Sequence, residues 1–260
     1  MKLYRTYGII LRYFFLMRRS FDIASDTFYW PTIDLLLWGL TGLYFASFAP
    51  GSHIVYTVVS GILFWIVMWR GQYEITVGFL YELWDRNLIN IFVSPIGFFE
   101  WVLGLLTMGI VKATISFSFT ATIAFFLYKV GVLSYGLYLI PFLFLLLLNG
   151  WWVGFLVAGI LMRFGTKIQT FAWTTVAILS PFSGIYYPTS ILPQWAQTIS
   201  HFVPSSYVFE GARELVKTGH FDFQKVLISF GLNLVYLVLA ISFMRWSFKK
   251  IFDRGLTSLQ

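Results

Sequence analysis

The sequence predicts an all-α membrane protein with six transmembrane helices, on the basis of composition, hydropathy and the lengths of its apolar segments. Hydrophobic residues make up 58% of the 260 residues and charged residues only 11%, and the mean hydropathy is +0.77. A water-soluble domain needs far more charge on its surface. A bilayer core requires about 20 helical residues to cross, and six apolar stretches approach that length. The chain is therefore expected to form one membrane domain over residues 1–260.

The expected elements follow from the alternation of apolar runs and short polar breaks. An amphipathic helix is predicted over 1–20, a six-span bundle over 31–245 and a cytoplasmic tail over 246–260. Individual spans are predicted at 31–48, 54–70, 104–128, 136–160, 169–187 and 225–245. The first two are short, so interfacial residues are expected to extend them.

Basic residues predict the orientation of these spans. With the N-terminus in the cytoplasm, 13 of the 18 Lys and Arg residues fall on the cytoplasmic side, as the positive-inside rule requires. Both termini are therefore expected in the cytoplasm of a multi-pass protein of the cell (inner) membrane, in a bacterium or archaeon. The net charge of +7 is spread over span ends, so the lipid bilayer is an expected partner and nucleic acid is not.

Several kinds of chemistry are excluded by what the chain lacks. There are no cysteines, which removes disulfides, thiolate metal sites and cysteine nucleophiles. The three histidines are scattered, so no metal site is predicted. No GxxxxGK[ST] phosphate loop occurs, and the dipeptide Gly-Lys is absent. A protein of this kind that moves cargo uphill needs a motor on another polypeptide, or an ion gradient.

Residues 2–19 predict a helix lying in the membrane interface. Leu3, Tyr7, Ile10, Phe14 and Met17 recur at three- and four-residue steps, which places them on one helical face. Arg5, Arg12 and Arg19 are spaced by seven on the opposite side, where they are expected to face anionic head groups. The helix is either a plain anchor or an elbow that steers the first span and braces a partner.

The segment FLYELWDRNLINIFVSP, between spans two and three, predicts a short cytoplasmic helix that ends before Pro95. Glu82, Arg86 and Asn90 are spaced by four and would form one polar ridge with a Glu82–Arg86 pair. Such a helix either docks into a groove on another protein or merely links two spans.

The fifth span is predicted to break near its end. Pro181 and Gly184 interrupt its apolar run, and Pro188 and Pro193 follow; proline removes a backbone donor and disrupts the preceding turn. A short re-entrant or interfacial helix is expected next. Glu210, Arg213 and Glu214 are expected to pair locally on an exposed helical turn.

Polar residues inside the predicted spans are expected to have structural roles. Asp34 follows Pro31 by three and is expected in the first turn of span one, where the helix dipole favours an anion. Lys112 is expected to extend its amine toward the interface or, as a second possibility, to meet Asp34. Asn149 and Asn233 are expected to bridge helices.

Two motifs resemble the membrane subunit of a type 2 ABC exporter. The first is an acidic and a basic residue in a short helix, a Ser-Pro step, and a span opening with Glu100, Leu103 and Gly104. The second is SPFSGIYYPTSILPQWAQTISHFVPSSYVFEGARELVKTG, with Ser-Gly, aromatic-Pro and Leu-Pro-x-Trp steps followed by Pro, Tyr, Glu and Arg. In order and in the right topology, the matches cover essentially the whole chain.

The resemblance implies specific partners and site residues. A coupling helix, with Glu82, Asp85, Arg86 and Asn90, would dock into a separate nucleotide-binding ATPase. Two permeases, identical or paralogous, would work with two ATPases; ATP and Mg would be used by the ATPase, with no cofactor bound by this chain. An outer gate would lie near Tyr186, Tyr187 and Trp195. The leader lacks the basic-aromatic step of the polysaccharide-exporting branch.

The sequence therefore favours a permease subunit of an ATP-driven exporter, itself not an enzyme. A lining with few fixed charges favours amphiphilic or hydrophobic cargo: a drug-like compound, a lipid or a lipid-linked glycan. The alternatives are an intramembrane protease or lipid-modifying enzyme, which needs clustered His, Glu or Asp, and an ion-coupled secondary transporter, which needs buried acids in paired broken helices.

Overall fold

The computed structural model describes residues 2–49 and 53–254, and within them every regular element is helical. Short 3-10 turns, labelled η, connect or extend several of the α-helices. The elements are α1 (Leu3–Arg19), α2 (Phe21–Phe48), α3 (Ile54–Trp84), α4 (Leu88–Val93), α5 (Phe98–Tyr128), η1 (Val132–Tyr138), α6 (Leu139–Phe164), η2 (Gly165–Ile168), α7 (Phe171–Leu179), η3 (Ser180–Phe182), η4 (Thr189–Ile191), α8 (Gln194–Ser200), α9 (Pro204–Thr218) and α10 (Phe223–Arg254).

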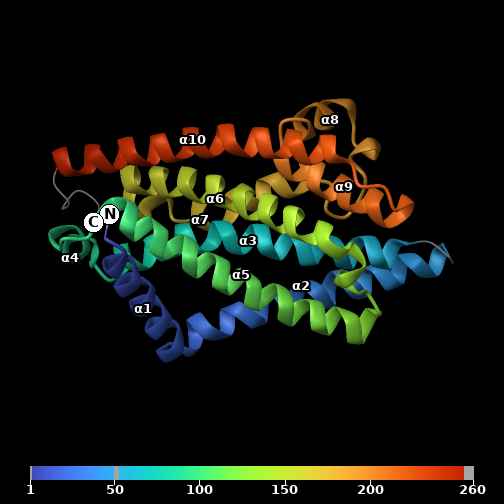
Figure 1. The fold of residues 1–260 in the computed structure, drawn as a ribbon, viewed down its shortest axis with the longest axis horizontal. Helices are drawn as coiled ribbons and strands as arrows, with labels where there is room; N and C mark the ends of the chain where they lie inside the picture. The colour runs from blue at the N-terminus through green and yellow to red at the C-terminus, as the bar shows by residue number, and fades with distance from the viewer. Residues whose placement is uncertain (1, 50–52, 255–260) are drawn as a thin grey trace.

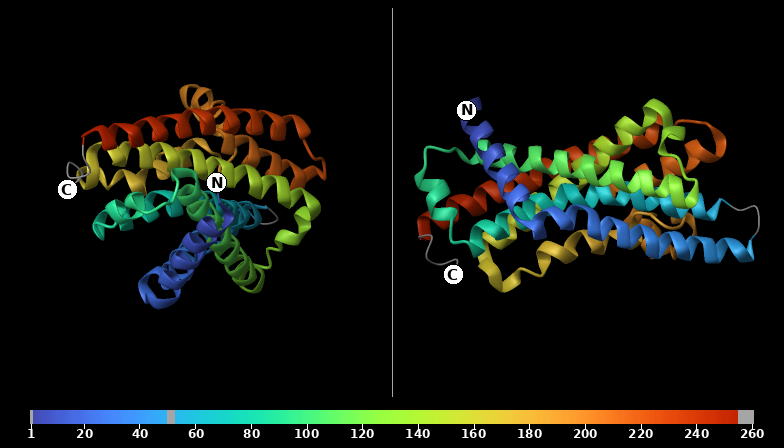
Figure 2. Two further views of the ribbon diagram at one scale, coloured as in Figure 1. Left: turned by 60° about the vertical axis from the view of Figure 1, so that its left-hand side comes forward. Right: turned by 90° about the horizontal axis from the view of Figure 1, so that it is seen from below.

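The long helices run roughly side by side along one axis (Figure 1). The first and last described residues lie at the same end of this bundle, near α1 and α4, whereas α8 and α9 lie at the other end. α1 crosses its end of the bundle obliquely, as both views of Figure 2 show. We call these the α4 end and the α9 end.

In the part of the chain that the structure describes, four helical stretches are long and apolar enough to cross a membrane: Ile54–Trp84, Phe98–Tyr128, Val132–Ile168 and Phe223–Lys250. α2 has 28 residues, but Asp34 and several Trp, Tyr and Thr residues lower its hydropathy. α7 has only nine residues and, with η3, forms a short apolar stretch over Phe171–Phe182. The predicted fifth span is thus a nine-residue helix followed by the break that Pro181 and Gly184 predict.

α3 is the centre of the bundle, and it runs much farther than the predicted span of 54–70. Most of its side chains are buried from Val58 to Glu82, and it packs along α2, α5 and α6. Arg70 does not mark the end of a span, because its charge is paired inside the protein and the helix continues for 14 more residues. Similarly, α5 begins at Phe98 instead of 104, and α10 continues through residues predicted as tail; residues 255–260 lie outside the described chain.

Glycines allow α3 and α6 to approach closely. A Cβ built on Gly150 would lie 2.4 Å from the Met68 carbonyl oxygen, and one on Gly154 would lie 2.9 Å from Ile75 Cβ. These glycines are four residues apart, on one face of α6, and follow the small-xxx-small pattern of packed membrane helices. Backbone contact between the two helices therefore requires glycine at Gly150.

α2 begins at Phe21, ten residues before Pro31, and Ser20 caps it by accepting a hydrogen bond from the Ile23 amide at 3.4 Å. Pro31 has no N–H to donate to the carbonyl of Thr27, four residues earlier. The Ser116 hydroxyl of α5 donates to that carbonyl instead, at 2.7 Å. The proline defect inside α2 is therefore satisfied by a neighbouring helix.

Candidate functional site

Glu82 is the centre of a hydrogen-bonded cluster at the α4 end. Its side chain is buried, and both carboxylate oxygens accept from the Arg12 guanidinium, at 2.7 and 2.9 Å. The Tyr13 hydroxyl donates to the carboxylate at 2.8 Å, and the side-chain amide of Asn87 donates to it at 2.7 Å. Trp101 of α5 donates to the Tyr13 hydroxyl at 2.9 Å. Burial raises the pKa of Tyr13 above its usual range, so the phenol remains a proton donor.

The predicted polar ridge of Glu82, Arg86 and Asn90 does not form. α3 ends at Trp84, and Arg86 takes a left-handed backbone conformation with φ of 52°. The backbone N–H of Asn87 donates to the Glu82 carbonyl oxygen at 2.9 Å, and this hydrogen bond caps the end of α3. The predicted Glu82–Arg86 pair is wrong, because Glu82 points into the protein toward Arg12 whereas Arg86 is exposed. Asp85 and Asn90 are exposed beside it.

Arg5 and Arg12 of α1 differ from the prediction that they face lipid head groups, whereas Arg19 is exposed. Arg12 binds Glu82, and Arg5 donates to the Pro95 carbonyl and lies 3.9 Å from the Glu100 carboxylate. Buried carboxylates require such partners. The apolar residues Leu3, Tyr7 and Phe14 are instead exposed, which leaves that face of α1 free to contact lipid. α1 is thus joined to α3 by Arg12 and to the start of α5 by Arg5.

A chain of four charges lies between α2, α3 and α5. The Arg70 guanidinium is 2.7 Å from the Asp26 carboxylate and 4.0 Å from that of Glu74, and Lys112 Nζ is 2.8 Å from Glu74. Arg70, Glu74 and Lys112 are all at least nine-tenths buried. Lys112 therefore neither extends to the interface nor meets Asp34. Sequence reasoning missed Asp26 and Glu74, because the closest partner of each, Arg70 for Asp26 and Lys112 for Glu74, lies 44 and 38 residues away along the chain.

Asp34 lies in the interior of α2, thirteen residues after its first residue, so the expected position in a first helical turn is wrong. It lines a cavity of about 550 Å³ between α2, α3, α7 and the broken segment that follows η3. The other lining residues are Trp30, Pro31, Trp65, Ile66, Trp69, Arg70, Tyr73, Trp173, Ala177, Ser180 and Tyr186. Half of the lining residues are therefore Trp or Tyr.

The broken segment at 183–189 is held by α3 and α9. Gly184 has φ of +69°, and a Cβ on Gly61 of α3 would lie 2.3 Å from the Ile185 carbonyl oxygen. Arg213 donates to the Gly184 and Tyr187 carbonyls, at 2.5 and 3.3 Å. Because an irregular backbone at membrane depth must be covered by protein, these contacts explain how the break is tolerated.

Glu210 and Arg213 form the expected local pair, at 3.0 Å, but it is not a solvated surface turn. The Arg213 side chain is 8% exposed, and Glu210 accepts hydrogen bonds from the Thr189 amide and hydroxyl at 2.6 and 3.1 Å. Glu214 pairs with Lys225 of α10. The Glu210–Arg213 pair therefore holds the broken segment against α9.

The three aromatic residues predicted for an outer gate occupy different surroundings. Tyr186 stacks on Trp38 of α2, with ring centroids 4.1 Å apart, and lines the cavity. The Tyr187 hydroxyl donates to the Pro181 carbonyl at 3.0 Å. Trp195, on α8, is 64% exposed and packs edge-on against Phe182. Only Tyr186 of the three reaches the cavity.

Two predicted bridging asparagines behave differently. Asn233 of α10 donates to the Leu145 carbonyl of α6 at 3.2 Å, as expected for a helix bridge. Asn149 is fully buried, and neither its amide oxygen nor its amide nitrogen has a hydrogen-bond partner among the described residues. The structure therefore does not support the bridge predicted for Asn149.

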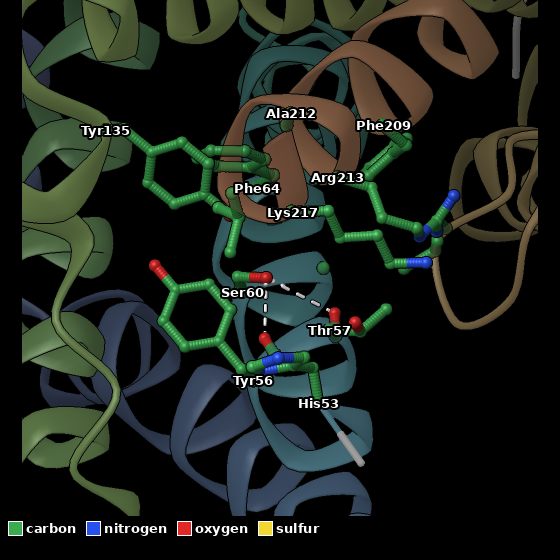
Figure 3. A pocket seen from close by; sticks show the side chains of 13 residues that line it. His53, Tyr56, Thr57, Ser60, Phe64, Tyr135, Phe209, Ala212, Arg213 and Lys217 are labelled. Carbon is green, nitrogen blue, oxygen red and sulfur yellow. Dashed lines mark hydrogen bonds between the residues drawn. The ribbon is translucent and has the colours of Figure 1, made fainter. Parts of the chain in front are cut away.

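A second, smaller pocket lies near the α9 end (Figure 3). Figure 3 shows Arg213 and Lys217 of α9 extending toward the same side of the view, above Thr57 of α3, while Tyr56 lies on the other side. Its volume is about 20 Å³, room for one or two water molecules. It is too small for a transported molecule.

A family model described as ABC-2 type transporter matches residues 10–216. The chain belongs to the ABC-2 type transporter family. The match covers α2 to α8 with most of α1 and α9, so it includes the Glu82 cluster, the charge chain and the broken segment. Comparison with curated proteins gives no match.

Membership in the ABC-2 type transporter family makes this chain a multi-pass membrane subunit of an ABC transporter. Such a permease works with an ABC ATPase and often dimerises. No cluster of three or more His, Cys, Asp or Glu residues suited to a metal ion occurs in the part of the permease that the structure describes.

Proposed function

We propose that this permease forms the membrane half of an ATP-driven exporter, which moves amphiphilic or hydrophobic cargo from the cytoplasm or inner leaflet. A separate nucleotide-binding ATPase would bind ATP and Mg, and a second copy of this chain or a paralogous permease would complete the assembly. In this arrangement the single domain over 1–260 has no cofactor of its own.

The proposed arrangement has six membrane crossings. α2 and the segment made of α7, η3 and the break at 183–189 join the four long apolar stretches. A 28-residue helix is about 42 Å long, which is enough for α2 to span. Arg18, Arg19, Arg86, Arg163 and Arg245 belong to the α4 end, which supports a cytoplasmic location for it and for both termini. The inner membrane of a bacterium or archaeon suits such a protein.

The turn after α3 and the exposed Asn90 at the start of α4 form the proposed ATPase contact, and the backbone at Arg86 is the observation that carries it. A left-handed conformation at a residue other than glycine costs about 1–3 kcal/mol, and such strain is typical of functional sites. Here it presents the Arg86 side chain to solvent, between exposed Asp85 and Asn90. Through Asn87 and Glu82 the turn is bonded to α1, and through Tyr13 to Trp101 of α5. A displacement of the turn would therefore be transmitted to α1, α3 and α5.

Arg86→Gly tests this contact without disturbing the fold. Glycine readily adopts the left-handed conformation, so the variant should insert and fold normally while losing the side chain. We expect ATPase co-purification or cargo-stimulated ATP hydrolysis to fall at least about fivefold, the loss of a contact of roughly 1 kcal/mol or more. Lys129→Gly is the matched control, because Lys129 also has a left-handed backbone, with φ of 57°, but lies just after α5, at the end of the bundle opposite α4 (Figure 1).

Two results would count against the proposal. If no nucleotide-binding ATPase is recovered with the chain from its native membrane, the exporter assignment is wrong. If Arg86→Gly retains full coupling while Lys129→Gly does not, the ATPase docks elsewhere. Transport that persists without ATP and follows a proton gradient would favour an ion-coupled transporter.

A further inference from the structure

The cavity beside α2 is lined by aromatic rings, which is a more specific property than hydrophobicity alone. Six Trp and Tyr side chains contribute to it: Trp30, Trp65, Trp69, Tyr73, Trp173 and Tyr186. Its volume of about 550 Å³ lies within the usual range for small-molecule sites. The faces of aromatic rings carry negative electrostatic potential and attract cations, most strongly where water is excluded.

The charges around the cavity leave one carboxylate without an opposite charge. Arg70 lines the cavity, but it is paired with Asp26 and lies beside Glu74, which in turn binds Lys112. The two positive and two negative charges of this group of side chains therefore neutralise one another. Asp34 takes part in none of the ion pairs found among the described residues. An ionised Asp34 gives the cavity a net negative charge.

The depth of Asp34 makes this carboxylate costly unless it has a partner. It lies about 20 Å along α2 from its first residue, and fourteen further helical residues follow it. An acidic side chain inside a membrane helix generally faces a cavity or a counter-ion, because exposure to hydrocarbon is expensive. The cavity supplies space for that counter-ion, and the described protein does not supply the ion.

We propose that this cavity is a binding site for organic cations, in which Asp34 is the counter-ion and the surrounding Trp and Tyr rings hold the cationic group. The ligand would be an amphiphile with a quaternary ammonium, phosphonium or protonated amine group. This inference rests on the proposed export function only in taking the bound cation as cargo; the binding site itself is independent of ATP.

Lipophilic ions of equal shape and opposite charge provide the test. Tetraphenylphosphonium and tetraphenylborate are added to the full-length permease in nanodiscs, with empty nanodiscs as background, and binding is followed by tryptophan fluorescence and by equilibrium dialysis. We expect saturable binding of the cation and no saturable binding of the anion. Saturable binding of both ions with similar affinity would overturn the proposal.

Substitutions then locate the site. Asp34→Asn is expected to weaken cation binding about tenfold or more, as loss of a counter-ion from a partly buried site implies, and Asp34→Glu to retain it. Asp22→Asn is the matched control, because Asp22 is exposed on the same helix and does not line the cavity. Trp173→Leu should weaken binding severalfold through loss of one ring. Unchanged affinity in folded Asp34→Asn would refute the assignment.

The outcomes separate this inference from the proposed function. Recovery of an ATPase with no specific binding of the cation leaves the exporter and removes the cation site. Binding that depends on Asp34, with no ATPase recovered, leaves the site and removes the exporter.

Discussion

Glu82 shows how one residue can link a surface turn to the rest of the permease. The sequence indicates a helix-surface carboxylate pairing with Arg86, four residues away. In the structure the carboxylate is buried and accepts hydrogen bonds from Arg12, Tyr13 and Asn87. An i,i+4 pair contributes only a few tenths of a kcal/mol, so the buried bidentate contact with Arg12 easily outweighs it.

Glu82→Ala is expected to destabilise the permease, because it removes the common acceptor of three donors. A buried donor that loses its partner costs about 1–3 kcal/mol, and none of the three donors is exposed. Asp85→Ala, at the neighbouring exposed position, should change stability by less than about 0.5 kcal/mol. Thermal unfolding in detergent, followed by circular dichroism, measures both. Equal melting temperatures for the two variants would contradict the role given to Glu82.

At the scale of single elements, α2 illustrates how a helix with a defect can be kept in a membrane bundle. Pro31 leaves the Thr27 carbonyl without its usual partner, and the Ser116 hydroxyl fills the vacancy from α5. The same logic applies to the broken segment, where Arg213 donates to the carbonyls of Gly184 and Tyr187. In both places the irregular backbone is satisfied by another helix, not by water.

Ser116→Ala should therefore lower stability by about 1–3 kcal/mol, since it leaves a buried carbonyl without a donor. The loss should shrink in a Pro31→Ala background, because alanine restores the amide that bonds to Thr27. A double-mutant cycle of unfolding free energies measures the coupling between the two sites. Additive effects would show that the serine does not compensate for the proline.

The sequence predicted some of these elements well and others poorly, for identifiable reasons. α1 and the break after α7 were both expected, since helical periodicity and proline chemistry are local properties. The end of α3 was misplaced, because Arg70 looks like a cytoplasmic anchor when its partner Asp26, on another helix, is unknown. Asp34 was misplaced for a related reason: Pro31 suggested a helix start, but the helix continues through it. Pairings across distant helices are not visible in spacing along one chain.

At the scale of the whole molecule, the distribution of elements makes a topology that can be tested. α1, α4 and both ends of the described chain share one end of the bundle, and α8 and α9 share the other (Figure 1). The proposed orientation puts the first group in the cytoplasm. The Asp85–Asn90 turn and the α8 surface would then face opposite sides of the membrane.

Single cysteines should report this arrangement directly, because the natural chain contains none. Ser190→Cys and Asn90→Cys introduce thiols at two exposed positions. In intact cells a membrane-impermeant maleimide should label the first and not the second, and permeabilisation should make both reactive. Labelling of Asn90→Cys alone in intact cells would show that the orientation is reversed.

The charge chain across α2, α3 and α5 also bears on how the permease enters the membrane during synthesis. Asp26 is made first, Arg70 and Glu74 follow on one helix, and Lys112 comes last. Arg70 lies within 4.0 Å of Glu74 on the same helix, so α3 carries its own partial neutralisation before α5 exists. α3 can then leave the insertion machinery with Asp26 of α2 already in place and Glu74 on its own surface, and Lys112 of α5 meets Glu74 last.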